Sequence, residues 1–164
     1  MKINRTRLHP LYDQYSNQEN RLTHALLHTI GSSEWLLSRF LKQIVGFELS
    51  LTGETYEIST QKKPLSQGGE DPKEIASIPD GWIVDGNSTL GIAIEVKDRK
   101  NCLNKKQLDS HAKPIKSCQH PYLIVITPDL KKPKEITHFE RKTERNMMVV
   151  WRSWEEKSGT SINK

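Results

Sequence analysis

The chain has 164 residues, of which 34% are apolar and 27% are charged, and its formal net charge at pH 7 is +5. Because two separate cores in a chain of this length would each be marginally stable, we expect one domain over residues 1–164. No segment approaches the roughly 20 apolar residues that cross a bilayer, and the N-terminus lacks a signal peptide's apolar centre, which excludes a membrane protein and favours the cytoplasm.

The N-terminal part of the chain predicts an arm followed by two helices. Residues 1–15 are expected to form the arm. A first helix should begin near the capping residues Ser16 and Asn17, because apolar residues recur behind them at helical spacing, namely Leu22, Leu26, Leu27 and Ile30. A second helix is expected over residues 33–45, ended by Gly46. Its buried side should consist of Trp35, Leu36, Phe40, Leu41 and Ile44.

The rest of the chain predicts an alternation of strands and helices. Residues 55–60 have the alternating pattern of a strand, and residues 61–73 should form a mobile loop, either a flap over substrate or a surface excursion. Two strands flank a tight connection at residues 85–88. A helix over 104–112, a buried strand over 122–126, a helix over 133–145, a strand over 147–151 and a disordered tail over 156–164 follow. A helix between two strands indicates a crossover, so the expected fold class is α/β.

Positive charge is concentrated in one segment. Between Lys97 and Lys116 there are seven basic and two acidic residues, an excess equal to the net charge of the whole chain. A polyanion such as nucleic acid is the natural partner of this segment, although a solvated helix face would also explain it. The residues expected to bind nucleic acid are Arg99, Lys100, Lys105, Lys106, His111 and Lys113. A second group, Lys131, Lys132 and Lys134, would extend this surface, diluted by Glu135, Glu140 and Glu144.

Other reactive and aromatic side chains have ordinary structural explanations. Cys102 and Cys118 are too few for a disulfide framework and lack the spacing of a zinc site, so we expect reduced thiols. His24 and His28 lie one turn apart, but no third ligand accompanies them, which favours packing or surface roles. Of the four tryptophans, Trp35, Trp82 and Trp151 lie in apolar segments, where core packing is more common than stacking on bases.

The predicted hairpin over residues 79–97 places three charged side chains on one face. Opposed residues of an antiparallel pair have a constant sum of positions, and each strand alternates faces with period two. A loop at Gly86-Asn87 would put Asp80 opposite Ala93, with Glu95 as its diagonal neighbour, whereas a four-residue loop would put Asp80 directly opposite Glu95. Any loop of even length therefore leaves Asp80, Glu95 and Lys97 on the same face.

Two opposed carboxylates favour the binding of a cation between them. Their mutual repulsion is destabilising unless a positive charge lies between them. Lys97 could supply that charge, and so could a divalent metal ion. Carboxylate ligands completed by water suit Mg²⁺ or Mn²⁺, whose usual partners are phosphate oxygens. The chemistry that this pattern indicates is metal-assisted phosphodiester hydrolysis, with Lys97 beside the reacting groups.

Pro79-Asp80 and Glu95-Val96-Lys97 resemble the two signature elements of the PD-(D/E)XK nuclease superfamily. This resemblance implies a restriction-endonuclease-like fold, in which a mixed central sheet is flanked by helices. It also implies that Asp80 and Glu95 bind a metal ion together with the main-chain carbonyl of Val96, and that Lys97 lies beside the attacking water.

Residues on two predicted helices extend the resemblance. Glu19 should lie on or beside the core-facing side of the first helix, where a charge needs a partner. The resemblance implies that Glu19 completes the metal site; a capping box over residues 16–19 is the alternative. Gln107, followed one turn later by His111, is similar to the glutamine and tyrosine of the RecB-like branch, which implies that Gln107 holds substrate or metal ligands. Histidine replaces the tyrosine, so the role of His111 stays open, as does a solvated Gln107.

The sequence therefore predicts a Mg²⁺- or Mn²⁺-dependent endonuclease that hydrolyses DNA, with RNA left open as a substrate. Its expected catalytic residues are Asp80, Glu95, Lys97, Glu19 and Gln107. One alternative is a nucleic-acid-binding module without turnover, and another is a nuclease subunit that needs a partner protein. A domain of this size would need two copies to cut both strands at once, so a homodimer is a further expectation.

Overall fold

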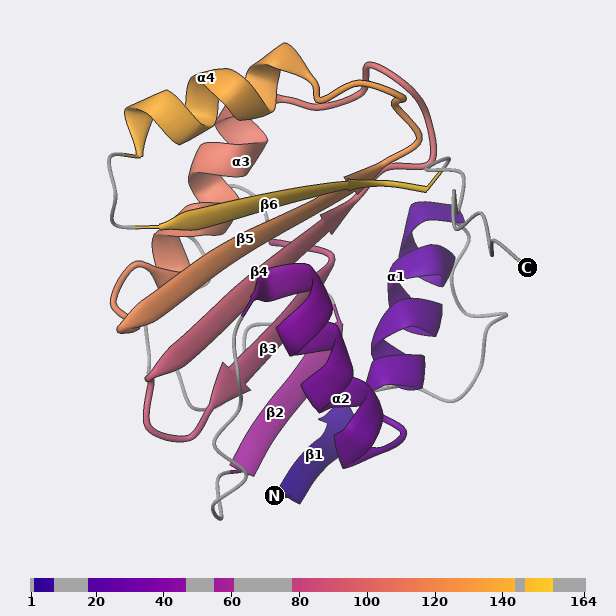
Figure 1. Cartoon of the computed structure of the whole chain (residues 1–164), viewed down its shortest axis with the longest axis vertical. Coiled ribbons are helices and arrows are strands. Elements are labelled where there is room, and N and C mark those ends of the chain that lie inside the picture. The colour runs from indigo at the N-terminus through magenta and orange to yellow at the C-terminus, as the bar shows by residue number, and fades with distance from the viewer. Residues whose placement is uncertain (1, 8–17, 47–54, 61–77, 144–146, 155–164) are drawn as a thin grey trace, which may run out of the picture.

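A mixed β-sheet forms the centre of the molecule (Figure 1). The computed structural model describes residues 2–7, 18–46, 55–60, 78–143 and 147–154. Within these residues, six strands lie side by side in chain order. They are β1 (Lys2–Arg7), β2 (Thr55–Thr60), β3 (Gly81–Asp85), β4 (Leu90–Val96), β5 (His120–Thr127) and β6 (Met148–Ser153). The strands β2, β3 and β4 are antiparallel neighbours, whereas β1 pairs with β2, and β5 with β4 and β6, in parallel.

Helices cover both faces of the sheet, which confirms the α/β class (Figure 1). One face packs against α1 (Gln18–Ile30), α2 (Glu34–Phe40) and the π-helical turn η2 (Leu41–Val45) that continues α2. The other face packs against α3 (Lys105–Ala112), the 3₁₀ turn η4 (Lys113–Ile115) and α4 (Lys134–Lys142). No helix in the described part of the chain has the length and apolar character needed to cross a membrane.

The central strand β4 is buried on both faces because a helix layer lies on each side. Its residues Leu90, Ile92, Ile94 and Val96 belong to the core beneath α1 and α2. Ala93 projects from the opposite face into the core beneath α3 and α4. Glu95 and Lys97 follow Ala93 at intervals of two, so the backbone directs these two charged residues to the α3 face as well.

Two N-terminal expectations are wrong. Residues 2–7, expected within an arm, form the edge strand β1, whose pairing with β2 depends on main-chain hydrogen bonds rather than on an apolar pattern. Trp35, expected in the core, is 63% exposed, with the guanidinium of Arg39 5.2 Å from the centre of its ring. The fully buried stripe of α2 and η2 consists of Leu37, Leu41 and Val45, which recur every four residues. Of the predicted buried side, Leu41 is confirmed, and Phe40 and Ile44 pack against the same core.

The remaining sequence predictions for the elements are largely confirmed. Ser33 caps α2 by accepting a hydrogen bond from the Leu36 N–H at 3.2 Å, and Gly46 ends η2 with a φ of +77°. Asn104 caps α3 in the same way through Lys106. Trp82 is fully buried, Trp151 packs against the core, and neither Cys102 nor Cys118 forms a disulfide. The caps at Ser16 and Asn17, the loop over 61–73 and the tail over 156–164 lie outside the described residues.

The close packing of η4 on β4 gives a first prediction. A Cβ atom added at Gly91 would collide with Sγ of Cys118 and lie 3.3 Å from Cβ of Ile115. We therefore expect Gly91→Ala to lower the free energy of unfolding by about 1–3 kcal/mol, measured by urea denaturation. The matched control is Gly86→Ala in the β3–β4 turn, where the nearest atom is the Thr55 carbonyl oxygen at 4.0 Å. Equal stability of the two variants would contradict this account of the packing.

Candidate active site

The β3–β4 hairpin has the register that opposes the two carboxylates. Gly81 pairs with Ile94 and Val84 with Gly91, so the connection is four residues long and Asp80, just before β3, lies opposite Glu95. Asp85 stabilises this turn by accepting a hydrogen bond from the Leu90 N–H at 3.0 Å. Of the two registers that the sequence left open, the structure has the one in which Asp80 and Glu95 are directly opposed.

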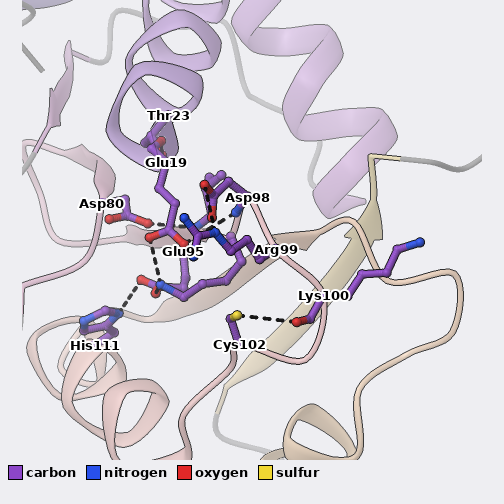
Figure 2. Close-up of polar contacts among 11 residues, drawn as sticks. Glu19, Thr23, Asp80, Glu95, Asp98, Arg99, Lys100, Cys102 and His111 are labelled. Atoms are coloured by element: carbon purple, nitrogen blue, oxygen red, sulfur yellow. Dashed lines mark hydrogen bonds and ion pairs between the residues drawn. The ribbon is translucent and has the colours of Figure 1, made fainter. Parts of the chain in front are cut away.

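Glu95 is the most enclosed member of the cluster. Its side chain has no exposed surface, which would be costly for a carboxylate without partners. Nζ of Lys97 lies 2.7 Å from Oε1, and Nδ1 of His111 lies 2.8 Å from Oε2. Figure 2 shows His111 approaching Glu95 from the side opposite Glu19.

Asp80 is the carboxylate of this cluster whose pKa is raised. Its Oδ2 accepts a hydrogen bond from the Val96 N–H at 2.8 Å. Burial, followed by repulsion from Glu95, raises the pKa of Asp80 to about 7, although the Val96 N–H and Lys97 act in the opposite direction. Positive charge within the cluster is therefore insufficient to hold all of its carboxylates ionised at neutral pH.

Glu19 joins the cluster from α1, on the other side of the sheet. Its Oε2 lies 3.3 Å from Nζ of Lys97, and its Oε1 accepts a hydrogen bond from the Asp98 N–H at 3.5 Å (Figure 2). The close approach of α1 depends on Gly81, because a Cβ there would collide with Leu27 and lie 3.2 Å from Cγ2 of Thr23. Thr23 lies one helical turn after Glu19, so this packing sets the distance from Glu19 to the hairpin.

Lys97 is the ammonium group shared by the carboxylates. Its side chain is 8% exposed and reaches both Glu95 and Glu19. Burial lowers the pKa of Lys97, but attraction to Glu95, Glu19 and Asp80 outweighs burial and raises the pKa above its usual value. Lys97 therefore remains protonated and acts as a fixed positive charge rather than as a base.

The other predicted site residues lie in different parts of the structure. Arg99, Lys100, Lys105 and Lys106 are exposed after the carboxyl end of β4, where nucleic acid could reach them. Lys113 is also exposed, but it lies in η4, which packs near Gly91 toward the amino end of β4. Gln107 is half-buried on α3.

His111 requires a correction. It was expected to bind nucleic acid, but its side chain is fully buried against Glu95 and cannot reach a strand on the surface. The sequence held a signal for this position, since Leu108, Ala112 and Ile115 are buried and His111 falls within the same stripe of α3 and η4. Histidine in such a stripe next to a buried carboxylate is a partner of that carboxylate.

The donor set of the cluster suits a hard divalent cation. When all three carboxylates are ionised, Glu19, Asp80 and Glu95 outnumber the single ammonium of Lys97 and leave two negative charges in excess. Over the described ranges, no group of three or more His, Cys, Asp or Glu side chains is arranged to hold a metal ion. Mg²⁺, however, is commonly bound through one or two carboxylates with water and phosphate oxygens as the remaining ligands. Asp80 and Glu95 meet that smaller requirement.

Comparisons with known proteins add no further information on this site. No protein-family model, no curated protein and no solved structure matches the chain.

The raised pKa of Asp80 predicts a pH-dependent cost to folding. Because this pKa is about 7 in the folded protein against 3.8 for an ordinary aspartate, ionisation opposes folding increasingly from about pH 4 to about pH 7. Asp80→Asn retains an oxygen that can accept from Val96 but cannot ionise. In EDTA, we expect this variant to be more stable than the native protein by about 1–3 kcal/mol near pH 8, with a smaller difference near pH 5. A difference independent of pH in denaturation experiments would contradict the shift.

The contact between His111 and Glu95 gives a separate prediction. His111→Leu roughly preserves side-chain volume but leaves Oε2 of Glu95 without its nitrogen partner in a fully buried position. The expected loss of unfolding free energy is about 1–3 kcal/mol. His111→Asn, which can place an amide nitrogen near the position of Nδ1, should lose less. If leucine were tolerated as well as asparagine, the contact would have no role in stabilising Glu95.

Proposed function

We propose that this protein is a metal-dependent endonuclease that hydrolyses phosphodiester bonds in DNA. The observation that carries the proposal is the direct opposition of Asp80 and Glu95, with Lys97 on the same strand face and Glu19 reaching the same point from α1. Structural ion pairs usually balance acids with bases, whereas this cluster keeps an excess of carboxylates beside the exposed basic residues that follow β4.

Asp80 and Glu95 would hold the metal ion, with Glu19 and the main-chain carbonyl of Val96 as further ligands. When bound, Mg²⁺ or Mn²⁺ would supply Lewis acidity toward a phosphate oxygen and lower the pKa of a coordinated water molecule. Oε1 of Glu95 is held by Lys97 in the structure, so a cation that shares Glu95 competes with that ammonium. Lys97 would then be directed toward the substrate.

Lys97 has the properties needed to stabilise charge on a reacting phosphate. Its ammonium is held by two carboxylates, and its raised pKa keeps it protonated. A preorganised positive charge in a largely buried position is more effective than one in water, because little reorganisation is needed as negative charge develops. We therefore assign Lys97 to the attacking water or the scissile phosphate, and not to proton abstraction.

Arg99, Lys100, Lys105 and Lys106 supply the surface that would hold the DNA backbone. All four are exposed after the carboxyl end of β4, close in sequence to Lys97. Lysine and arginine bind phosphates without regard to sequence, so these residues would position the duplex and make binding sensitive to salt. Gln107, on the same helix as Lys105 and Lys106, would help to hold substrate or metal ligands.

The fold supports a restriction-endonuclease-like assignment as part of this proposal. The mixed sheet, the β3–β4 hairpin that carries Asp80 and Glu95, and the α1 helix that carries Glu19 agree with what the PD-(D/E)XK resemblance implies. Two copies of the chain would be needed to cut both strands at once, so we include a homodimer on DNA in the proposal.

A non-catalytic nucleic-acid-binding module, or a subunit that is active only with a partner protein, is the rival function. The contacts of Lys97 with Glu95 and Glu19 favour the first of these, because an ammonium buried between carboxylates can also stabilise a cluster that binds no metal. Only an assay of DNA cleavage separates a nuclease from a non-catalytic binding module.

The test is incubation of supercoiled plasmid with the purified protein and Mg²⁺ or Mn²⁺. We expect nicking or linearisation that EDTA abolishes. Asp80→Ala, Glu95→Gln and Lys97→Ala should each reduce the cleavage rate by about a hundredfold or more, because each removes a group next to the reacting phosphate. Lys116→Ala, an exposed change near the amino end of β5, is the matched control and should cleave normally.

Cleavage that survives EDTA, or that is undiminished in the Asp80 and Lys97 variants, would overturn the assignment. Metal-independent DNA binding without cleavage of plasmid, single-stranded or branched DNA would support the binding module. Cleavage that appears only after neighbouring gene products are added would identify a subunit that depends on a partner.

A further inference from the structure

A cavity of about 740 Å³ lies beside the candidate active site, between the segment after β4 and the segment after β5. Its walls include Lys100 and Asn101 on one side and residues 129–135 on the other. Since β4 and β5 are parallel neighbours, their carboxyl ends lie at the same edge of the sheet, and the Lys97 N–H donates to the Ile126 carbonyl at 2.9 Å. The cavity therefore lies at the edge of the sheet where β4 ends and Lys97 follows. Its size falls within the roughly 300–1,000 Å³ that is usual for small-ligand sites.

Asp129 joins the two walls of this cavity. Its Oδ1 accepts a hydrogen bond from the Asn101 N–H at 3.1 Å, and Asn101 has a φ of +58°, which asparagine tolerates better than most residues do. Asp129 is only 8% exposed and lines the cavity. Among the described residues, no donor reaches its Oδ2. A buried carboxylate oxygen without a donor indicates a missing hydrogen-bond partner.

With four lysines against Asp129 and Glu135, the lining of the cavity is suited to an anion with an apolar part. Lys100, Lys131 and Lys134 are exposed at its rim, whereas Lys132 is engaged by Glu140. The cavity also lies at the N-terminus of α4, whose first turn has no side-chain cap because Pro133 occupies that position. Uncapped N–H groups at a helix start favour a phosphate. Leu130, 68% exposed at the same rim, offers an apolar surface to a base or sugar.

A ligand that satisfies all these groups must combine a phosphate, an apolar ring and a hydrogen-bond donor. A nucleotide has this combination, since its phosphate suits the lysines and its base carries N–H groups for Asp129. A base in an intact duplex is stacked and paired, so only an unpaired nucleotide could enter. Since Oδ2 of Asp129 is covered by protein atoms, we expect a side chain at the rim to move as the base enters.

We propose that this cavity binds an unpaired nucleotide of the DNA substrate, with its phosphate on Lys131 and Lys134 and its base on Asp129. This inference extends the proposed nuclease function and rests on it, because that function identifies the bound nucleotide as part of a DNA strand. It predicts that DNA with an overhang or an extruded base next to the cleavage site binds more tightly than a fully paired duplex.

The test compares two fluorescent hairpin DNAs that share one stem closed by a non-nucleotide linker, of which one is blunt and the other carries a short single-stranded extension at the open end of the stem. Binding to the full chain is measured by fluorescence anisotropy in EDTA, so that no cleavage occurs. We expect the extended hairpin to bind roughly tenfold more tightly than the blunt one. Asp129→Asn keeps an oxygen for the Asn101 N–H but replaces the second oxygen by a donor, and should remove most of this preference.

Two further variants complete the design. Lys131→Ala/Lys134→Ala alters exposed side chains only and should reduce the preference without affecting folding, which keeps the test valid if Asp129→Asn is unstable. Lys116→Ala removes one positive charge near the amino end of β5, away from the cavity, and should leave the preference intact. Equal affinity of the native protein for both hairpins, or a preference that persists in the double variant, would overturn the proposal. A preference for the extension without any cleavage would support the cavity and count against the nuclease, whereas cleavage without a preference would do the reverse.

Discussion

The arrangement of the site depends on one constraint, which is the opposition of two carboxylates across a β-hairpin. The four-residue connection between β3 and β4 fixes the register, and that register puts Asp80 against Glu95 at the point where the strand pair ends. Without a nearby positive charge, two such carboxylates would destabilise the pairing of the two strands. The molecule meets this repulsion with Lys97, with a main-chain N–H at Asp80 and with His111 at Glu95, and still leaves the pKa of Asp80 near 7.

Each layer of the fold contributes one side chain to this cluster. From one face of the sheet, α1 delivers Glu19, and its close approach is permitted by the missing Cβ at Gly81. From the other face, α3 delivers His111. Parallel pairing with β5 then places the segments that carry Lys100 and Asp129 beside the same edge. Residues distant in the sequence thus gather at the carboxyl end of β4, as ligand sites commonly do in open α/β sheets.

Much of this arrangement followed from local patterns in the sequence. Period-two alternation, combined with a hairpin loop of even length, was sufficient to place Asp80, Glu95 and Lys97 on one face. Loop length was not determined by alternation, so two registers remained open until the pairing of Gly81 with Ile94 was known. The contact of His111 with Glu95 was missed because it depends on where α3 packs on the sheet. The edge strand β1 was missed because it has little apolar alternation to reveal it.

The central claim is that Asp80 and Glu95 share a divalent cation. A crystal of the full chain soaked in Mn²⁺ and measured for anomalous scattering tests it most directly. Our account predicts an anomalous peak within coordination distance of oxygens from both side chains, accompanied by displacement of the Lys97 ammonium from Glu95. The absence of any peak there, in crystals whose Asp80 and Glu95 remain accessible to the soak, would contradict it.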